Sequence, residues 1–320
     1  MRILFIGTGD IGLPALRWLL ASGHEIAAVF TQPDKPAGRR MELTPSPIKT
    51  LALAHDIPVF QPVKMRAPES VAQVQSFGAD LIVVMAYGQI LPRGVLEAAR
   101  IACINLHASI LPRHRGAAPI QSAILSGDKE TGITVMYVDA GLDSGDILLI
   151  HRVPIHRHDT GGALHDRLAA AAPAALAEAI ALLDAGAAPR IPQDDTLSTY
   201  AKKLGRDDGE IRWERPSGEI SRQIRAMNPW PGAFTLLPGR DGPPRKLKVF
   251  EAAQNPRRSG PPGEVLSAGP RGILIGCGSG ALLLREVQME GKRRMAVRDF
   301  LTGRAVPPGI TLGTPNGNRA

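Results

Sequence analysis

The sequence contains few aromatic residues, few cysteines and no long apolar run, and each shortage excludes a class of protein. Aromatic residues make up only 4% of the 320 positions, so a core must consist mainly of Ala, Leu, Ile and Val. The two cysteines, Cys103 and Cys277, are too few and too far apart for a disulfide framework or a metal knuckle. No apolar run approaches the roughly 18 residues that a membrane span needs. We therefore expect a cytoplasmic protein that holds no metal and does not enter a membrane.

The charge of the chain is unevenly distributed. The net charge is +8, yet residues 201–320 hold 21 Lys and Arg against 11 Asp and Glu, a net of +10. The first 200 residues hold 17 basic and 19 acidic residues, a net of −2. A strongly basic second part favours a polyanionic partner such as a nucleic acid. A general surplus of arginine that serves only solubility is the alternative.

The N-terminal segment has the pattern of a nucleotide-binding turn. Residues 2–7 form a short apolar run typical of a strand, GTGDIG follows, and an apolar periodic helix spans residues 13–20. Gly7, Gly9 and Gly12 match the G-x-G-x-x-G pattern of dinucleotide sites. The acidic residue expected after the second strand is missing, because Thr-Gln-Pro stands there. Glycines that serve only close packing of strand and helix are the alternative.

The proline-rich segment 31–49 has no apolar period and predicts a long functional loop. Arg39 and Arg40 lie near its predicted tip. They are candidates for contacts with phosphate groups, and a solvated turn is the alternative.

Two strands are predicted to end at the same edge of a sheet. Residues 81–86 are fully apolar, as in a buried parallel strand. A second apolar run delivers Asn105 and His107, which face one side because strand residues alternate. The alternative is a strand end that only turns these two polar residues towards water.

The turn after the first of these strands has backbone groups suited to hydrogen bonding with a flat heterocycle, and it comprises Ala86, Tyr87, Gly88, Gln89, Ile90 and Leu91.

Asp143 is the third candidate for chemistry. It lies between Gly141 and Gly145 in a constrained turn, where aspartates also cap backbone amides. If Asn105, His107 and Asp143 converge, the amide and the imidazole can stabilise an oxyanion while the carboxylate orients the imidazole. No Ser or Cys occupies a nucleophile turn. The set therefore suits direct attack on a carbonyl by an external nucleophile, without a covalent enzyme intermediate.

The order of predicted elements indicates two domains. Alternating strands and helices over residues 1–189 predict an α/β domain with a Rossmann-like, mostly parallel sheet and helices on both faces. The polar residues 190–206 are predicted to form a linker. Short strands rich in Gly and Pro predict a small OB-like β-barrel over 207–320. Its densest positive cluster, a candidate contact for nucleic acid, comprises Lys292, Arg293 and Arg294.

Two motifs resemble those of a known family. NLHASILP at 105–112, followed by RGAAPIQ at 115–121, is similar to the signature of 10-formyltetrahydrofolate-dependent formyltransferases, and the turn 139–145 resembles their second motif. The resemblance implies that 10-formyltetrahydrofolate is the formyl donor, with no metal involved. It also implies a catalytic set of Asn105, His107 and Asp143, and a folate-contacting segment of Ser109, Ile110, Leu111 and Pro112.

Nearly the whole chain is similar to those members of the family that formylate methionyl initiator tRNA. It includes TQPDKPAGRR at 31–40, NPWPGA at 228–233 and the segment 292–301. The resemblance implies that Arg39, Arg40 and the cluster at 292–294 contact tRNA in translation initiation. We also expect a monomer. A formyltransferase or hydrolase acting on a small molecule is the nearer alternative, and an NAD-dependent oxidoreductase built on GTGDIG is the more distant one.

Overall fold

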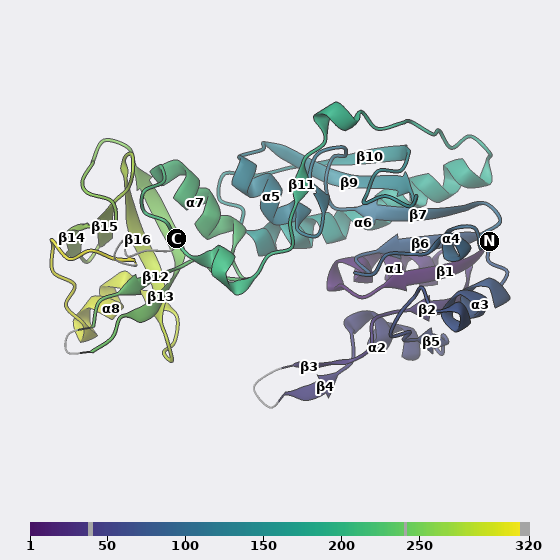
Figure 1. Ribbon diagram of the computed structural model, residues 1–320, viewed down its shortest axis with the longest axis horizontal. Coiled ribbons are helices and arrows are strands. Elements are labelled where there is room, and N and C mark those ends of the chain that lie inside the picture. The colour runs from purple at the N-terminus through teal and green to yellow at the C-terminus, as the bar shows by residue number, and fades with distance from the viewer. Residues whose placement is uncertain (38–40, 240–241, 314–320) are drawn as a thin grey trace. The chain divides into compact units, whose positions relative to one another are not determined.

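The computed structural model describes residues 1–37, 41–239 and 242–313, and the chain separates into two compact units (Figure 1). The first unit comprises Met1–Ile120, Lys129–Ile155 and Leu164–Lys202, and the second comprises Gln121–Asp128, His156–Ala163 and Lys203–Ala320.

A seven-stranded sheet forms the centre of the first unit (Figure 1), in the order β10-β9-β7-β6-β1-β2-β5. The five strands from β7 to β5 run parallel, and β9 and β10 add an antiparallel edge. The strands are β1 (Arg2–Gly7), β2 (Glu25–Phe30), β5 (Val59–Phe60), β6 (Leu81–Met85), β7 (Ala102–His107), β9 (Glu130–Tyr137) and β10 (Ile147–Pro154).

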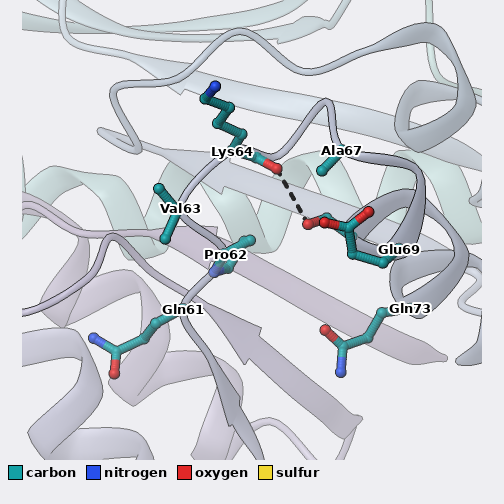
Figure 2. Close-up of a pocket in the computed structure, with 8 residues that line it drawn as sticks. Gln61, Pro62, Val63, Lys64, Ala67, Glu69 and Gln73 are labelled. Carbon is teal, nitrogen blue, oxygen red and sulfur yellow. Dashed lines mark hydrogen bonds between the residues drawn. The ribbon is translucent and has the colours of Figure 1, made fainter.

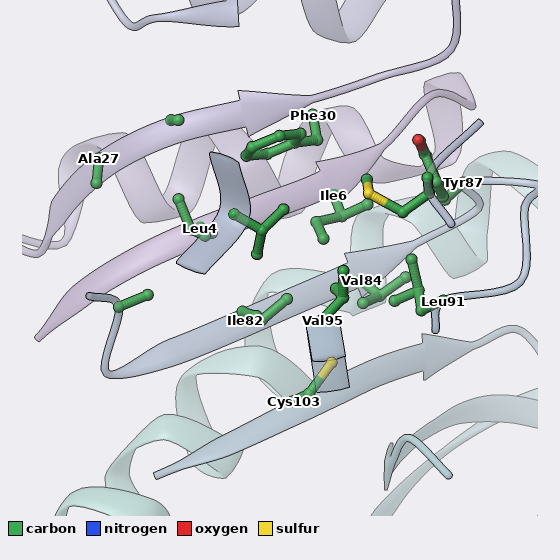
Figure 3. Close-up of a cluster of buried hydrophobic side chains, with 14 residues drawn as sticks. Leu4, Ile6, Ala27, Phe30, Ile82, Val84, Tyr87, Leu91, Val95 and Cys103 are labelled. Atoms are coloured by element: carbon green, nitrogen blue, oxygen red, sulfur yellow. The ribbon is translucent and has the colours of Figure 1, made fainter. Parts of the chain in front are cut away.

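Helices cover both faces of this sheet because its central strands are apolar on both sides. Leu4 and Ile82 lie in one core cluster with Val74 of α3 and Val95 of α4 (Figure 3). On the opposite face, Phe5 lies against the turn that leads into α1. The helices of the first unit are α1 (Leu13–Ala21), α2 (Pro47–Leu53), α3 (Pro68–Ser76), α4 (Arg93–Leu96) and most of α6 (Gly161–Asp184), with 3₁₀ turns η1 (Asp10–Gly12) and η2 (Asp195–Leu197). Helix α5 (Pro119–Ser126) begins in the first unit and continues in the second.

Three of the seven phenylalanines gather at the β2–β5 edge. The rings of Phe30 and Phe60 are stacked with centroids 5.3 Å apart, and Phe77 meets both edge-on. Such ring pairs contribute about 0.5–1.5 kcal/mol each beyond their buried area. The scarce aromatic residues thus hold the short strand β5 to the sheet.

Two segments without an apolar period contain small strands. The predicted loop 31–49 forms a hairpin of β3 (Lys35–Ala37) and β4 (Glu42–Thr44). Within the predicted linker 190–206, β11 (Tyr200–Ala201) pairs in parallel with β8 (Arg115–Gly116). This segment therefore follows the surface of the first unit as far as Ala201.

The second unit is an antiparallel sheet in the order β12-β13-β16-β15-β14, with β17 beside β16. Its inner positions are apolar and fully buried, as at Leu247, Val249 and Ile273. The elements are η3 (Arg206–Gly209), α7 (Ser217–Ala226), β12 (Phe234–Leu237), β13 (Arg245–Asn255), β14 (Val265–Gly269), β15 (Gly272–Gly276), β16 (Ala281–Met289), β17 (Met295–Ala296) and α8 (Val297–Gly303).

The fold class predicted from the sequence is confirmed, since a mostly parallel sheet with helices is followed by an antiparallel β unit. Among the helices that the structure describes, none is both long enough and apolar enough to cross a membrane.

Candidate active site

The site is built on the last residues of β7. Asn105 and His107 share one face of this strand, and His107 is its final residue. His107 is buried, whereas Asn105 is half-buried. Within the described residues the structure shows no hydrogen bond to the Asn105 side chain, so its amide N–H groups are available for a substrate oxygen.

The hydrogen bonds of His107 fix one tautomer. Its Nε2 lies 2.9 Å from the carbonyl oxygen of His114, and a carbonyl oxygen only accepts, so Nε2 carries the hydrogen. Its Nδ1 lies 3.5 Å from Oδ2 of Asp143. Nδ1 carries a hydrogen only in the imidazolium form. The carboxylate of Asp143 therefore faces the ring nitrogen opposite the one that the His114 carbonyl holds.

Asp143 is held by its own backbone conformation and by a neighbouring strand. Its φ of +53° lies in the left-handed region, which aspartate tolerates better than most residues. The N–H of Gly116 donates to Asp143 Oδ2 at 2.8 Å. A Cβ on Gly145 would lie 1.8 Å from the Tyr137 carbonyl oxygen. The turn therefore requires glycine at position 145 to bring the carboxylate to His107.

The segment after β7 is fixed mainly by hydroxyl groups. Thr134 Oγ1 donates to the carbonyl of Ser109 at 2.6 Å and accepts from the N–H of Leu111 at 3.2 Å. The Ser109 hydroxyl donates to the carbonyl of Arg113 at 2.7 Å. Of the four residues that the resemblance assigns to folate, Ser109 and Leu111 are buried, whereas Ile110 and Pro112 are half-buried. The first two thus shape the segment, and the other two are accessible to a ligand.

The residues of the turn after β6 also differ in how deeply they are buried. Tyr87 and Leu91 are buried in the core cluster, and burial raises the pKa of Tyr87 to about 12. The other predicted residues of this turn face outwards to different degrees: Ala86, Gly88 and Ile90 are exposed, and Gln89 is half-buried.

The glycine-rich turn after β1 does not offer a cradle for phosphate. The N–H groups of Thr8 and Gly9 both donate to the carbonyl of Ala86, each at 3.2 Å. A Cβ on Gly7 would lie 2.7 Å from the Met85 carbonyl oxygen. The glycines therefore allow β1 and β6 to pack closely, and the amides of Thr8 and Gly9 are already used within the protein rather than left for a pyrophosphate.

The arrangement supports acyl transfer without a nucleophile from the protein. Burial raises the pKa of Cys103, on the same strand as His107, to about 12, so it is not a thiolate at neutral pH. No group of three or more His, Cys, Asp or Glu among the described residues could hold a metal ion. The available chemistry is oxyanion stabilisation and proton transfer by Asn105, His107 and Asp143.

A separate surface pocket of about 550 Å³ lies at the start of α3 (Figure 2). Its lining includes Pro62, Val63 and Gln73 but none of the predicted site residues. The Ser70 hydroxyl donates to the carbonyl of Lys64 across it, at 3.1 Å. The pocket is therefore distinct from the pair of His107 and Asp143.

The basic residues predicted to contact nucleic acid differ in their surroundings. Arg39 and Arg40 lie outside the described residues. Lys292 and Arg293 are exposed beyond the end of β16. Arg294 pairs with Glu286, and its guanidinium lies 4.3 Å from the centre of the Phe250 ring. Arg294 is exposed as well, but its guanidinium is also held against the antiparallel sheet.

Comparison with known proteins identifies the family. Residues 1–180 match the formyl transferase family, and residues 203–305 match the formyl transferase C-terminal domain. The methionyl-tRNA formyltransferase of Geobacter sulfurreducens is 46% identical over 313 residues, which cover 98% of this chain and 97% of the relative. That of Symbiobacterium thermophilum is 49% identical over 318 residues, which cover 98% and 96%. The chain belongs to the methionyl-tRNA formyltransferase family.

Solved structures of more distant proteins share the fold of this formyltransferase. HypX from Aquifex aeolicus, in complex with tetrahydrofolic acid, has a TM-score of 0.62 at 18% identity, over 94% of this chain and 47% of the other. The N-formyltransferase of Helicobacter canadensis, in complex with folinic acid and dTDP-3-aminofucose, has a TM-score of 0.65 at 18% identity, over 90% and 99%. At this identity the likeness extends to the fold alone.

Several residues that support the site of this formyltransferase were missed by sequence analysis. Thr134 lies in the middle of β9, and Gln193 and Thr199 lie in the predicted linker. Thr199 Oγ1 accepts from the N–H of His114 at 2.8 Å. Arg115 belongs to the signature stretch, but no sequence pattern indicates that its side chain is buried. The contacts of these residues are distant in sequence, so no local spacing reveals them.

Proposed function

We propose that the protein transfers the formyl group of 10-formyltetrahydrofolate to the α-amino group of methionyl initiator tRNA. The observation that supports it most is the approach of Asp143 to His107 on the strand that carries Asn105, whose amide has no hydrogen-bond partner among the described residues, in a chain 45–50% identical to methionyl-tRNA formyltransferases. The net charge of +10 on residues 201–320 favours a tRNA acceptor over a small molecule. The monomer and the cytoplasmic location remain predictions from the sequence.

In the proposed reaction the neutral amine attacks the formyl carbon, and a carbon–nitrogen bond forms as the carbonyl becomes an oxyanion. Asn105 donates a hydrogen bond to this oxyanion, which is worth about 3–4 kcal/mol per donor in well-organised sites, and His107 can add a second only when its Nε2–H leaves the His114 carbonyl. The bond from the formyl carbon to folate N10 then breaks. The amine loses one proton and N10 gains one, and the pair of His107 and Asp143 carries this proton.

The residues around β7 divide the tasks of binding and chemistry. Ile110 and Pro112, with the exposed residues of the turn Ala86–Leu91, form the proposed folate contacts. The proposed tRNA contacts are Arg39, Arg40, Lys292 and Arg293, together with Arg294 as part of the same cluster.

The function is tested by formylation with labelled 10-formyltetrahydrofolate and either methionyl-tRNA or small amines as acceptors. We expect label on methionyl-tRNA alone. His107→Ala should lower kcat by at least about 100-fold, because a donor and a proton carrier are lost, while tRNA binding stays near that of the wild type. The exposed His158 provides the matched control, and His158→Ala should keep full activity. A fully active His107→Ala enzyme, or label only on small amines, would contradict the proposal.

A further inference from the structure

Gln193 connects two parts of the candidate site that are far apart in sequence. Its Nε2 donates to the carbonyl of Asp143 at 2.9 Å and to the carbonyl of Gly145 at 2.8 Å. Its Oε1 accepts from Arg115, from Nε at 3.1 Å and from Nη2 at 2.8 Å. The next residue along, Gly116, donates its N–H to the Asp143 carboxylate. These contacts form a closed ring around Asp143.

The chemistry of the partners permits only one orientation of the Gln193 amide. Carbonyl oxygens only accept hydrogen bonds, and a guanidinium only donates them. The nitrogen must therefore face Asp143 and Gly145, and the oxygen must face Arg115. No flipped amide satisfies both sides.

The Arg115 side of the ring is anchored in the protein. The Arg115 side chain is only 4% exposed, and its Nη2 also lies 2.7 Å from Oδ1 of Asp195. Its backbone belongs to β8, which pairs with β11. A buried guanidinium with fixed partners is a rigid support. Gln193 therefore fixes the turn that carries Asp143 relative to β8.

We propose that Gln193 is a positioning residue, which holds the Asp143 turn so that the carboxylate faces His107. The proposal rests on the formyl transfer proposed above. Gln193 acts through the backbone of Asp143 and Gly145, so its loss should slow the chemical step and leave the binding of both substrates unchanged.

Two substitutions separate this role from simple support of Arg115. Gln193→Glu keeps the side-chain length and the acceptor for Arg115, but it places an oxygen against two carbonyl oxygens. Gln193→Met keeps the volume and removes both sets of contacts. We expect kcat to fall about 10- to 100-fold in both variants, with unchanged KM for 10-formyltetrahydrofolate and methionyl-tRNA.

Gln223 offers a matched control in the second unit. It is buried, and its Nε2 donates to the carbonyls of Asp208 at 3.1 Å and Glu210 at 2.9 Å. Gln223→Glu makes the same chemical change at a similar double contact outside the site. It should lower the midpoint of thermal unfolding and retain the wild-type kcat.

The outcomes are distinct. Wild-type kcat in Gln193→Glu would overturn the proposal, because a role limited to Arg115 survives that change. A rise in KM with unchanged kcat in either variant would overturn it as well. Thermal unfolding reports whether each variant folds, and if Gln193→Glu does not, Gln193→Met carries the same expectation for kcat. If the wild-type enzyme itself fails to formylate methionyl-tRNA, the proposed function fails instead.

Discussion

At the residue scale, the site depends on a few hydrogen bonds whose direction is fixed by chemistry. The carbonyl of His114 places a hydrogen on Nε2 of His107, which leaves Nδ1 facing Asp143 at 3.5 Å. His107 is therefore oriented by two neighbours, one at each ring nitrogen.

The turn that carries Asp143 gives the prediction at this scale. A Cβ on Gly145 would lie 1.8 Å from the Tyr137 carbonyl, so Gly145→Ala must shift the turn and the carboxylate. A displacement of about 1 Å lowers activity by about 100-fold, and steady-state kinetics should show the loss in kcat. Gly269, where a Cβ meets nothing within 4 Å, supplies the control, since Gly269→Ala should behave as wild type. Equal activity of the two variants would show that the turn tolerates movement.

Sequence alone could propose Asn105, His107 and Asp143, because strand alternation, a glycine-flanked turn and two family motifs are local patterns. Gln193 could not be proposed in this way. Its partners Asp143, Gly145 and Arg115 lie 50, 48 and 78 residues away. The pairing of β11 with β8 and the bridge between Ile191 and Ile147 bring them together.

At the element scale, the turn after β1 shows how the same sequence pattern serves two purposes. Gly7, Gly9 and Gly12 match a dinucleotide fingerprint, yet the carbonyl of Ala86 already accepts from the amides of Thr8 and Gly9. Ala86 reaches them through a φ of +49°. Nothing in the sequence around Ala86 indicates this conformation, so the two interpretations of the turn could not be separated without the structure.

The same turn yields a binding prediction. Because the amides of Thr8 and Gly9 are used within the protein, NADH should not bind, and titration should leave the fluorescence of the nicotinamide ring unchanged at concentrations that saturate ordinary dehydrogenases. Titration with 10-formyltetrahydrofolate in the same buffer serves as the positive control. The amount of folate bound to the protein should rise to saturation. Saturable binding of NADH would reopen the oxidoreductase alternative.

Short elements were the ones that sequence analysis missed. The strands of the β3–β4 hairpin are three residues long, and β8 and β11 are two residues long. Such strands are too short for an alternating pattern to be counted. Their pairing is set by tertiary contacts, so the sequence of segments 31–49 and 190–206 predicts only a loop and a linker.

At the scale of the whole molecule, the charge separates by sequence position. Residues 201–320 carry a net of +10 and the first 200 carry −2. A polyanion is therefore attracted mainly by the second part of the chain. The composition could predict this property in full, because net charge does not depend on the fold.

The salt dependence of tRNA binding tests this charge distribution. Lys292 and Arg293 are exposed, so the double variant Lys292→Ala/Arg293→Ala should reduce the slope of log affinity against log salt by about 2, or about 1 per lost phosphate contact. Fluorescence anisotropy with labelled methionyl-tRNA measures the slope. Arg17→Ala/Arg93→Ala removes the same charge from α1 and α4 and should leave the slope unchanged. Equal slopes in the two double variants would disprove a specific role for the cluster.

The second compact unit is assembled from three pieces of chain, and this has a consequence for how the protein can be divided. Its pieces at 121–128 and 156–163 precede the main piece by dozens of residues. Arg222 donates to the carbonyl of Leu125 at 2.9 Å, and Arg225 donates to that of Asp159 at 2.8 Å. Cutting the chain at a single position therefore does not release either unit intact. During synthesis on the ribosome, the two early pieces emerge well before their partners exist, so the second unit is completed only when the last third of the chain has been made.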